Sequence, residues 1–237
     1  MRKYILAAFA VASVVSAQAI VFPTSPHAAM NFIPFGGGLA GSIPTMHQVF
    51  ASSLFSAQTG GQAALISSIG FAPGVNGTWN LGQVTINLGY TNAIPGVAST
   101  SGGLVIPTQG GGGNNVGAMT NFWNNAATSF TVTAQSSSNF GEMVFNGTAF
   151  VYDPNVGNLL VEIIVPSSAN TLLTVSRSAG SAESSRAYSG MRFADSESFT
   201  TATRMDFTFT TVPEPGTFIA IGAGLALLAL RKKRTTK

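Results

Sequence analysis

The sequence predicts an all-β chain folded as an antiparallel β-sandwich or jelly-roll-like domain, with an N-terminal signal peptide and one C-terminal transmembrane helix. Two observations carry the fold class. Short runs that alternate apolar and polar residues recur along the chain, with Gly-, Asn- and Pro-rich turns between them. Amphipathic helical patterns do not alternate with these runs, which disfavours a parallel α/β fold.

The amino-acid composition excludes several classes of site and partner. The 237 residues include no cysteine, which excludes a disulfide framework and a thiolate zinc site. Between Ile20 and Thr211, four Arg stand against seven acidic residues, so this span is mildly acidic and has no clustered cations. Because nucleic acid is bound through clustered Lys and Arg, nucleic acid is excluded as a partner. No charge occurs between Tyr4 and Gly141, a composition common in extracellular β proteins.

Residues 1–19 predict a secretory signal peptide. Arg2 and Lys3 form a positive start, Tyr4–Val15 is apolar, and Ala17-Gln18-Ala19 fits an A-x-A cleavage site. The alternative is an ordinary buried N-terminal helix. Export would leave a mature chain that begins at Ile20.

The next two segments are less regular. Residues 20–44 hold four prolines and a Gly triplet, so we expect an irregular segment with one edge strand at most. Residues 45–58 fit either a helical face or a strand, and the β-branched and aromatic content favours two strands, Gln48–Phe55 and Ala63–Phe71, around a Thr59-Gly60-Gly61 turn.

Strand signals are clear from residue 83 onward, and together with the preceding segment they define a sandwich domain over 45–211. Alternation predicts exposed and buried faces for Gln83–Tyr90, Thr128–Ala134 and 205–210, with Phe207 and Phe209 inward. Leu159–Val165 is almost wholly apolar, which indicates a central strand. The dipeptides Asn76-Gly77 and Asn146-Gly147 are typical of hairpin turns.

Two features between residues 99 and 125 have competing interpretations. Gly110–Gly113 lacks the Lys and the helix start of a phosphate-binding loop, so a surface loop is expected. Trp123, and likewise Trp79, could stack on a sugar ring, but a place in the sandwich core is the favoured interpretation.

Candidate catalytic and metal-binding groups are sparse. His27 and His47 have no acidic residue near them in the sequence and are expected to be surface or packing residues. Asp195 and Glu197 are two apart and could share a strand face, although a solvated face is expected and no EF-hand ligand series is present. Glu142 and Glu162 could form the facing carboxylates of a glycosidase. We expect no enzymatic activity, no metal and no cofactor.

The last 26 residues combine three features. Val212-Pro213-Glu214-Pro215 leads into the apolar run Thr217–Leu230, and four cations follow: Arg231, Lys232, Lys233 and Arg234. A helix of 14 residues is about 21 Å long against a hydrocarbon core of about 30 Å, so the predicted transmembrane helix is a marginal anchor. The cationic cluster places the C-terminal side in the cytoplasm.

This three-part segment, residues 212–237, resembles the PEP-CTERM sorting signal of Gram-negative bacteria. The resemblance implies recognition by exosortase, a membrane transpeptidase-like enzyme, in species that make exopolysaccharide. The preceding domain is similar to a recurring group of PEP-CTERM proteins that are thought to be β-sandwiches, through Gln48–Phe55, Leu65–Phe71, Phe150–Pro154 and Gly157–Glu162. This similarity brings no catalytic residues with it.

Sequence and resemblance together predict an exported, non-catalytic surface or extracellular-matrix protein. Its partners would be the inner membrane and exosortase, with the domain in the periplasm and later at the cell surface or outside the cell. The first alternative is a carbohydrate-binding module that binds exopolysaccharide through Trp79 or Trp123. The second is a glycan-active enzyme.

Overall fold

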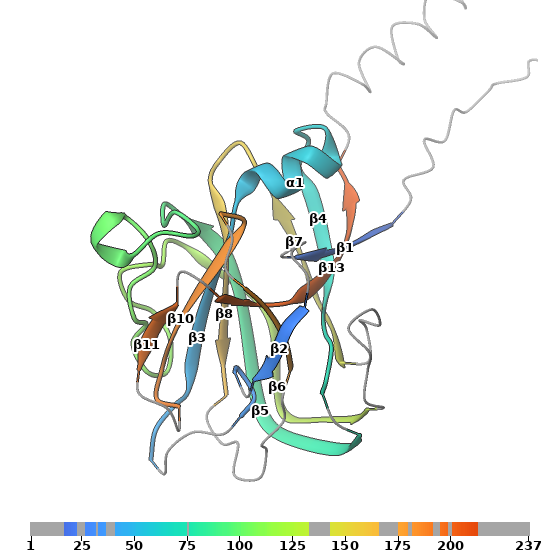
Figure 1. The fold of residues 1–237 in the computed structure, drawn as a ribbon. Coiled ribbons are helices and arrows are strands. Elements are labelled where there is room, and N and C mark those ends of the chain that lie inside the picture. The colour runs from blue at the N-terminus through green and yellow to red at the C-terminus, as the bar shows by residue number, and fades with distance from the viewer. Residues whose placement is uncertain are drawn as a thin grey trace, which may run out of the picture.

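The prediction of an all-β chain with antiparallel sheets is confirmed by the computed structural model of the protein. The structure describes residues 17–22, 27–31, 33–36, 41–74, 76–132, 143–165, 175–179, 182–191, 195–198 and 201–212. Within these ranges there are thirteen strands, one α-helix and one short 3-10 helix, η1 (Ser99–Ser101). Figure 1 shows the strands as two main layers with α1 across one end.

Three antiparallel sheets account for all the strands, and the larger two form the main layers. The four-stranded sheet has the order β1 (Gln18–Phe22), β13 (Met205–Thr211), β4 (Ala64–Phe71), β7 (Met143–Tyr152). The six-stranded sheet has the order β11 (Ser196–Ser198), β10 (Ser184–Ser189), β3 (Thr45–Phe50), β8 (Asn158–Ile164), β5 (Gly77–Thr91), β6 (Met119–Val132). A small sheet has the order β12 (Thr201–Thr203), β9 (Val175–Ala179), β2 (His27–Asn31).

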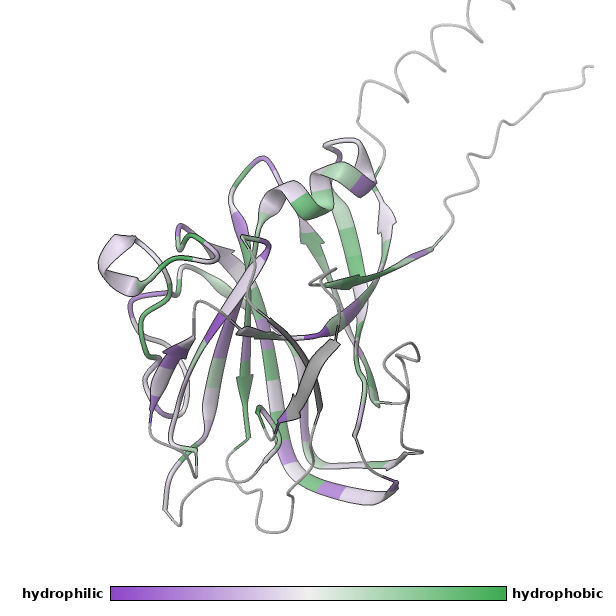
Figure 2. Cartoon of the chain, viewed as in Figure 1, coloured by the Kyte–Doolittle hydropathy of each residue, from purple (hydrophilic) through white to green (hydrophobic). Residues whose placement is uncertain are grey.

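Both main sheets contribute to one aromatic core. Phe207 of β13 lies edge-on to Phe50 of β3, with ring centroids 5.0 Å apart, and Phe55 of α1 packs on Phe207 at 5.6 Å. All three side chains are fully buried. Figure 2 shows the resulting pattern, with apolar bands interrupted by polar ones along the core strands. The alternation predicted for 205–210 is therefore confirmed, and that for Gln83–Tyr90 holds as far as Leu88, after which Gly89 is buried and Tyr90 is half-buried.

The segment 45–58 combines both of its sequence interpretations. Strand β3 runs from Thr45 to Phe50, as the strand interpretation expects, but residues 52–59 form the helix α1 (Ser52–Thr59). The prediction of a strand to Phe55 is therefore wrong in its second half. The helix allows Phe55 to turn into the core, where its ring lies 4.8 Å from Tyr152 and 5.2 Å from Phe22. Gly60, with φ of 64°, ends the helix.

The N-terminal segment is more regular than its proline content suggests. Strand β1 is an edge strand on β13, which fits the single edge strand expected, and β2 adds a second strand. The segment 20–44 therefore holds one strand more than expected, β2. Each of the two strands pairs with one described strand only, β1 with β13 and β2 with β9.

Neither predicted hairpin dipeptide forms a hairpin. Asn146-Gly147 lies inside β7, and Asn76-Gly77 leads into β5 from β4, which belongs to the other main sheet. Gly147 is needed because β6 crosses closely there. A Cβ at this position would lie 2.6 Å from ring carbons of Phe122 and would also collide with the backbone oxygen of Phe122.

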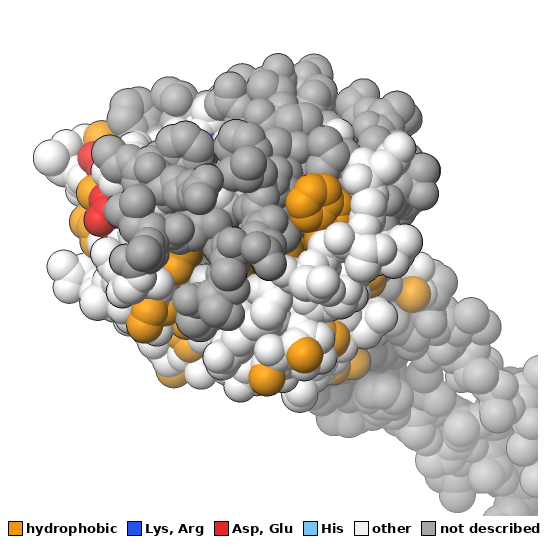
Figure 3. Space-filling model, turned by 90° about the horizontal axis from the view of Figure 1, so that it is seen from below, with side chains coloured by type: hydrophobic (Ala, Val, Ile, Leu, Met, Phe, Trp, Pro, Cys, Tyr) orange, Lys and Arg blue, Asp and Glu red, His pale blue; other side chains and the backbone are white. Residues whose placement is uncertain are grey.

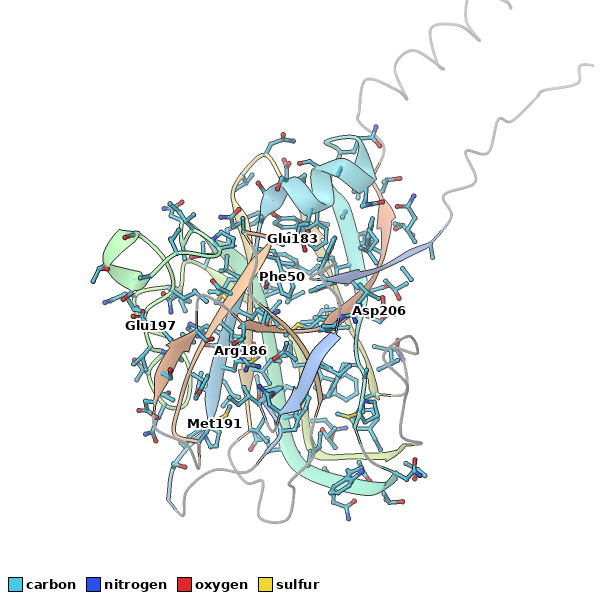
Figure 4. All side chains as sticks on the ribbon, viewed as in Figure 1. Phe50, Glu183, Arg186, Met191, Glu197 and Asp206 are labelled. Carbon is cyan, nitrogen blue, oxygen red and sulfur yellow. The ribbon has the colours of Figure 1, made fainter. Side chains whose placement is uncertain are left out.

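Buried polar side chains connect the small sheet to the six-stranded sheet. Arg186 of β10 donates from Nη1 to Thr203 Oγ1 at 2.8 Å. Gln48 of β3 donates to the Thr203 carbonyl at 2.7 Å and accepts from the Thr203 amide at 2.8 Å. Figure 4 labels Arg186 on β10, with Phe50 in the interior beneath α1.

Both ends of the domain lie side by side. Because β1 is antiparallel to β13 and Gln18 pairs with Phe209, Ala17 and Val212 lie at the same end of this strand pair. The Val212 amide donates to the Ala63 carbonyl at 2.8 Å, which fixes the last described residue to the connection between α1 and β4. Among the described residues, no helix has the length and apolar character needed to span a bilayer, and the predicted span Thr217–Leu230 lies outside these residues.

Candidate functional site

Polar side chains form a row across the outer face of the six-stranded sheet. In register, His47 of β3 pairs with Glu162 of β8, and Glu162 pairs with Asn87 of β5. The neighbours of His47 along β3, Met46 and Gln48, point to the inner side, because alternate residues of a strand face opposite ways. The row is therefore separate from the aromatic core.

Glu162 is the centre of this row. Its Oε1 accepts from His47 Nε2 at 2.9 Å and from the Gly112 amide at 2.6 Å. Its Oε2 accepts from Asn87 Nδ2 at 2.7 Å, and Asn121 Nδ2 donates in turn to Asn87 Oδ1 at 3.0 Å. Glu162 is 3% exposed and His47 is fully buried. We call His47, Asn87, Gly112, Asn115 and Glu162 the Glu162 network.

Asn115 determines which nitrogen of His47 carries the proton. The Asn115 amide group donates to the Val105 carbonyl at 2.6 Å and accepts from the Val105 amide at 2.8 Å, so its orientation is fixed. Its Nδ2 also donates to His47 Nδ1 at 3.0 Å. His47 Nδ1 must therefore be an acceptor, and the proton resides on Nε2, facing Glu162.

Glycines close the connection between β5 and β6, residues 92–118, over the network. Gly110–Gly113 all have positive φ, between 83° and 107°, which favours glycine. At Gly111 a Cβ would lie 2.7 Å from Ile164 and 3.1 Å from Glu162. The stretch expected to be a surface loop thus also covers a buried carboxylate and binds it through a backbone amide.

His47 is fully buried, which fits the packing interpretation, but it has an acidic partner, Glu162, that its sequence neighbours did not reveal. Its partner lies 115 residues away in the sequence, on the neighbouring strand. Because the two residues are so far apart in the sequence, sequence proximity did not indicate that they pair. A usable signal was present for Glu162, which is the single charged residue in the apolar strand Leu159–Val165 that the sequence indicated.

Hydrogen bonding controls the ionisation of Glu162. Burial alone would raise the pKa of this carboxyl group, but the hydrogen bonds from His47, Asn87 and the Gly112 amide lower the pKa to about 2. Because the folded-state pKa lies below the ordinary value, ionised Glu162 stabilises the fold above about pH 4.5 and loses this contribution as the pH falls.

We expect a pH-dependent difference in stability between the wild-type chain and Glu162→Gln. On acidification from about pH 6 to about pH 3, the free energy of unfolding of the wild type should fall by about 2 kcal/mol more than that of the variant. In this pH range the Glu162 carboxyl group takes up a proton in the unfolded chain but stays mostly ionised in the folded chain. Urea unfolding at both pH values measures this. Glu197→Gln is the control. A constant wild-type advantage would contradict the assignment.

The Glu162 network does not present a catalytic base to a substrate. A histidine with a carboxylate at one nitrogen resembles two members of a catalytic triad. Here, however, the second nitrogen of His47 accepts from Asn115, and no hydroxyl group of the described residues is hydrogen-bonded to it. Both side chains are buried beneath the glycine stretch. Glu142, the other carboxylate considered for glycosidase chemistry, lies outside the described residues.

Asp195 and Glu197, the other acidic candidates, accept hydrogen bonds from two different backbone amides. Asp195 Oδ1 accepts from the Gly190 amide at 2.7 Å, whereas Glu197 Oε2 accepts from the Ser99 amide at 3.3 Å. Figure 4 shows Glu197 at the outer edge of β11. In the parts of the chain that the structure describes, no three His, Asp or Glu side chains come together to hold a metal. The side chain of His27 is outside the described set.

Both tryptophans pack on the main core. Trp123 lies edge-on to Phe145, with ring centroids 5.6 Å apart, and Trp79 contacts the same core cluster. Each side chain is only partly exposed, and each indole Nε1 is buried without a hydrogen-bond partner. These contacts favour the packing interpretation over a sugar-stacking platform.

An open pocket of about 600 Å³ lies beside the Glu162 network. Its wall combines the end of β5, at Tyr90 and Thr91, with two parts of the β5–β6 connection and with Val156 from the turn between β7 and β8. The lining residues are uncharged throughout. Sequence inspection missed this pocket because its parts come from separate turns and loops.

The predicted processing residues lie at the margins of the described structure. Ala17 is exposed and precedes β1, and Ala19 is exposed within β1. Val212 follows β13 directly. The remaining motif and basic residues lie outside the described part of the chain: Pro213, Glu214, Pro215, Arg231, Lys232, Lys233 and Arg234.

Comparison with protein families matches residues 211–234 to the PEP-CTERM protein-sorting motif. Neither the comparison with curated proteins nor that with solved structures finds a match. The matched span begins at the last residue of β13 and ends with the last of the four clustered cations. Such a motif supports export, membrane association and sorting by exosortase, followed by surface display. The chain therefore carries a PEP-CTERM protein-sorting motif at residues 211–234, which is consistent with a PEP-CTERM domain-containing protein.

Proposed function

We propose that the chain is an exported, non-catalytic surface or extracellular-matrix protein whose β domain is delivered through its C-terminal segment. A signal peptide over 1–19 starts export, and the segment Thr217–Leu230 holds the domain at the inner membrane, on the periplasmic side. Exosortase then processes the tail and leaves the domain at the cell surface or in the matrix. The match of residues 211–234 to the sorting motif carries this proposal.

The junction between domain and motif supports processing. Thr211 still pairs with Ala64 in the four-stranded sheet, and Val212 is fixed by the Ala63 carbonyl. Pro213 and Pro215 follow at once, and prolines favour an extended chain that cannot continue sheet pairing. A membrane enzyme can therefore act on the motif without unfolding the domain.

The charges on the tail support its orientation. Thr217–Leu230 is uncharged and the four following residues are cations, so the positive-inside rule places them in the cytoplasm. The domain then lies on the opposite side of the membrane. A short span and two glycines, Gly222 and Gly224, make a weak anchor, which suits a segment that is removed.

The absence of catalysis is proposed from the best acid–base pair on the described chain. Glu162 and His47 have the chemistry of a proton-transferring pair, but their hydrogen-bonding atoms are engaged by Asn87, Asn115 and Gly112. The network joins the β5–β6 connection to the sheet, which is a structural task.

Intact-mass analysis of the protein from the native envelope tests the proposal. In an exosortase-containing strain, the wild-type protein should lack Arg231–Lys237, because cleavage at the motif removes them. Replacing Pro213, Glu214 and Pro215 together by Ala should give a chain that keeps this tail and stays in the membrane fraction.

Replacing Thr235 and Thr236 by Ala, beyond the cationic cluster, is the matched control and should be processed normally. A mature wild-type protein that keeps Arg231–Lys237 would refute the processing step. If the triple variant were processed as fully as the wild type, Pro213–Pro215 would not be part of the sequence that exosortase recognises.

A further inference from the structure

We propose that the open pocket beside the Glu162 network binds a neutral saccharide chain. The pocket lies between the β5–β6 connection and the turn at Val156, away from both tryptophans. The inference goes beyond sorting and does not depend on it, because binding by the purified chain can be measured whether or not the tail is processed.

The chemistry of the wall selects the ligand class. No Lys, Arg, Asp, Glu or His lines the pocket, whereas three asparagines and one tyrosine do: Asn92, Asn114, Asn115 and Tyr90. A charged ligand desolvated here would find no countercharge. Amide groups offer both donors and an acceptor, which is what the hydroxyl groups of a neutral sugar require.

Two of these amides are available for a ligand. Asn92 and Asn114 are exposed, and neither side chain makes a hydrogen bond to another described residue. Asn115 differs, because Val105 and His47 occupy its amide. Asn92 and Asn114 come from opposite ends of the β5–β6 connection and are brought to one pocket by the fold.

The wall is fixed before any ligand arrives. Asn158 donates to the Ala93 carbonyl at 2.9 Å, and the Ala93 amide donates to Thr91 Oγ1 at 3.1 Å, which holds the backbone beside Asn92. On the other side, the bonds of Asn115 to Val105 hold the backbone next to Asn114. Such preorganisation lowers the entropy lost on binding.

Apolar groups complete the pocket. Val156 is 63% exposed, and the half-buried Tyr90 ring is stacked at 5.5 Å on Tyr152. The Tyr90 hydroxyl accepts from the Asp153 amide at 2.8 Å, so the ring cannot swing away. The C–H face of a sugar can pack on such surfaces while its hydroxyl groups contact the amides.

Size and surroundings agree with a chain-like ligand. A volume of about 600 Å³ is within the usual range for small-molecule sites. The pocket is open rather than enclosed, so a longer chain can continue out of it. On the face seen in Figure 3, hydrophobic side chains are scattered over the described surface and the visible acidic groups lie at one edge.

Isothermal titration of the full chain tests this proposal. The chain is kept in a detergent without a sugar headgroup, because a glycosidic detergent would compete for the pocket. The probes are cellohexaose, maltohexaose and mannohexaose, with hexagalacturonate as the acidic comparison. At least one neutral probe should bind at least tenfold more tightly than hexagalacturonate.

Asn92→Ala with Asn114→Ala should weaken that binding about tenfold or more, as expected for the loss of two hydrogen bonds. Asn146→Ala, an exposed asparagine on β7, is the matched control and should bind like the wild type. Thermal unfolding of each variant verifies folding. Failure of all three neutral probes to bind, preference for hexagalacturonate, or unchanged binding by the folded double variant would each overturn the proposal.

Discussion

Glu162→Ala is expected to lower the free energy of unfolding by about 3 to 5 kcal/mol, the largest single effect of the substitutions considered for this chain. The carboxylate accepts from His47, Asn87 and the Gly112 amide. Its removal leaves these donors beside a small cavity, and each buried unpaired donor costs about 1 to 3 kcal/mol. The glycine stretch also loses its bond to the sheet.

Urea unfolding of the full chain in mild detergent, followed by tryptophan fluorescence, measures this change, since Trp79 and Trp123 pack on the core. Glu197→Ala is the matched control, because Glu197 is partly exposed and accepts a single bond of 3.3 Å; we expect a change of about 0.5 kcal/mol or less. Comparable losses in both variants would show that the Glu162 network is not a special stabilising element.

Gly147→Ala is expected to destabilise the chain by about 3 kcal/mol, although it adds one methyl group. β6 and β7 lie against each other at Gly147, and the new carbon would meet both the backbone oxygen and the ring of Phe122. The backbone of Phe122 belongs to a paired strand and its ring is buried, so neither can move without disturbing the core. Overpacking of this kind costs about 1 to 3 kcal/mol, and backbone displacement costs more.

The matched control is Gly157→Ala, in the turn between β7 and β8. A Cβ there would contact only the Thr91 carbonyl oxygen, at an ordinary 3.5 Å. The same unfolding measurement should show little change, or slight stabilisation through the lower entropy of the unfolded chain. If Gly147→Ala were as stable as Gly157→Ala, the close crossing of β6 and β7 would not be a constraint.

Alternation was a reliable guide to the strands. Val84, Ile86 and Leu88 face inward because the pleat places every second residue on one side. The same rule failed at 52–59, where Leu54 and Phe55 satisfy a helical and an extended pattern equally well. The helix prevails because it brings Phe55 onto the rings of Phe207 and Tyr152, a tertiary contact that local sequence does not contain.

The candidate site depends on tertiary structure more strongly than the strands do. The pairing of His47 with Glu162 follows from the register of β3 on β8, and register is set by the whole sheet. At Asn146-Gly147, by contrast, a strong local turn signal does not produce a turn. Gly147 lies within a strand, where the close approach of β6 leaves no room for a side chain. The pocket combines Asn92, Asn114 and Val156, which no sequence pattern links. The sorting motif, in contrast, is contiguous and was recognised from its residues alone.

Strand β1 constrains the order of events if the chain is cleaved after Ala19, as the sequence predicts. The predicted cleavage site, after Ala19, lies within this strand, where Ala19 pairs with Thr208 and Gln18 with Phe209. A peptidase that binds its substrate as an extended chain competes with β13 for the same backbone groups. If the leader is cleaved at this predicted site, cleavage has to precede the docking of β1, and the new amino terminus at Ile20 would then pair with β13 at Phe207. With cleavage after Ala19, removal of the leader would come before completion of the sheet edge that β1 and β13 form.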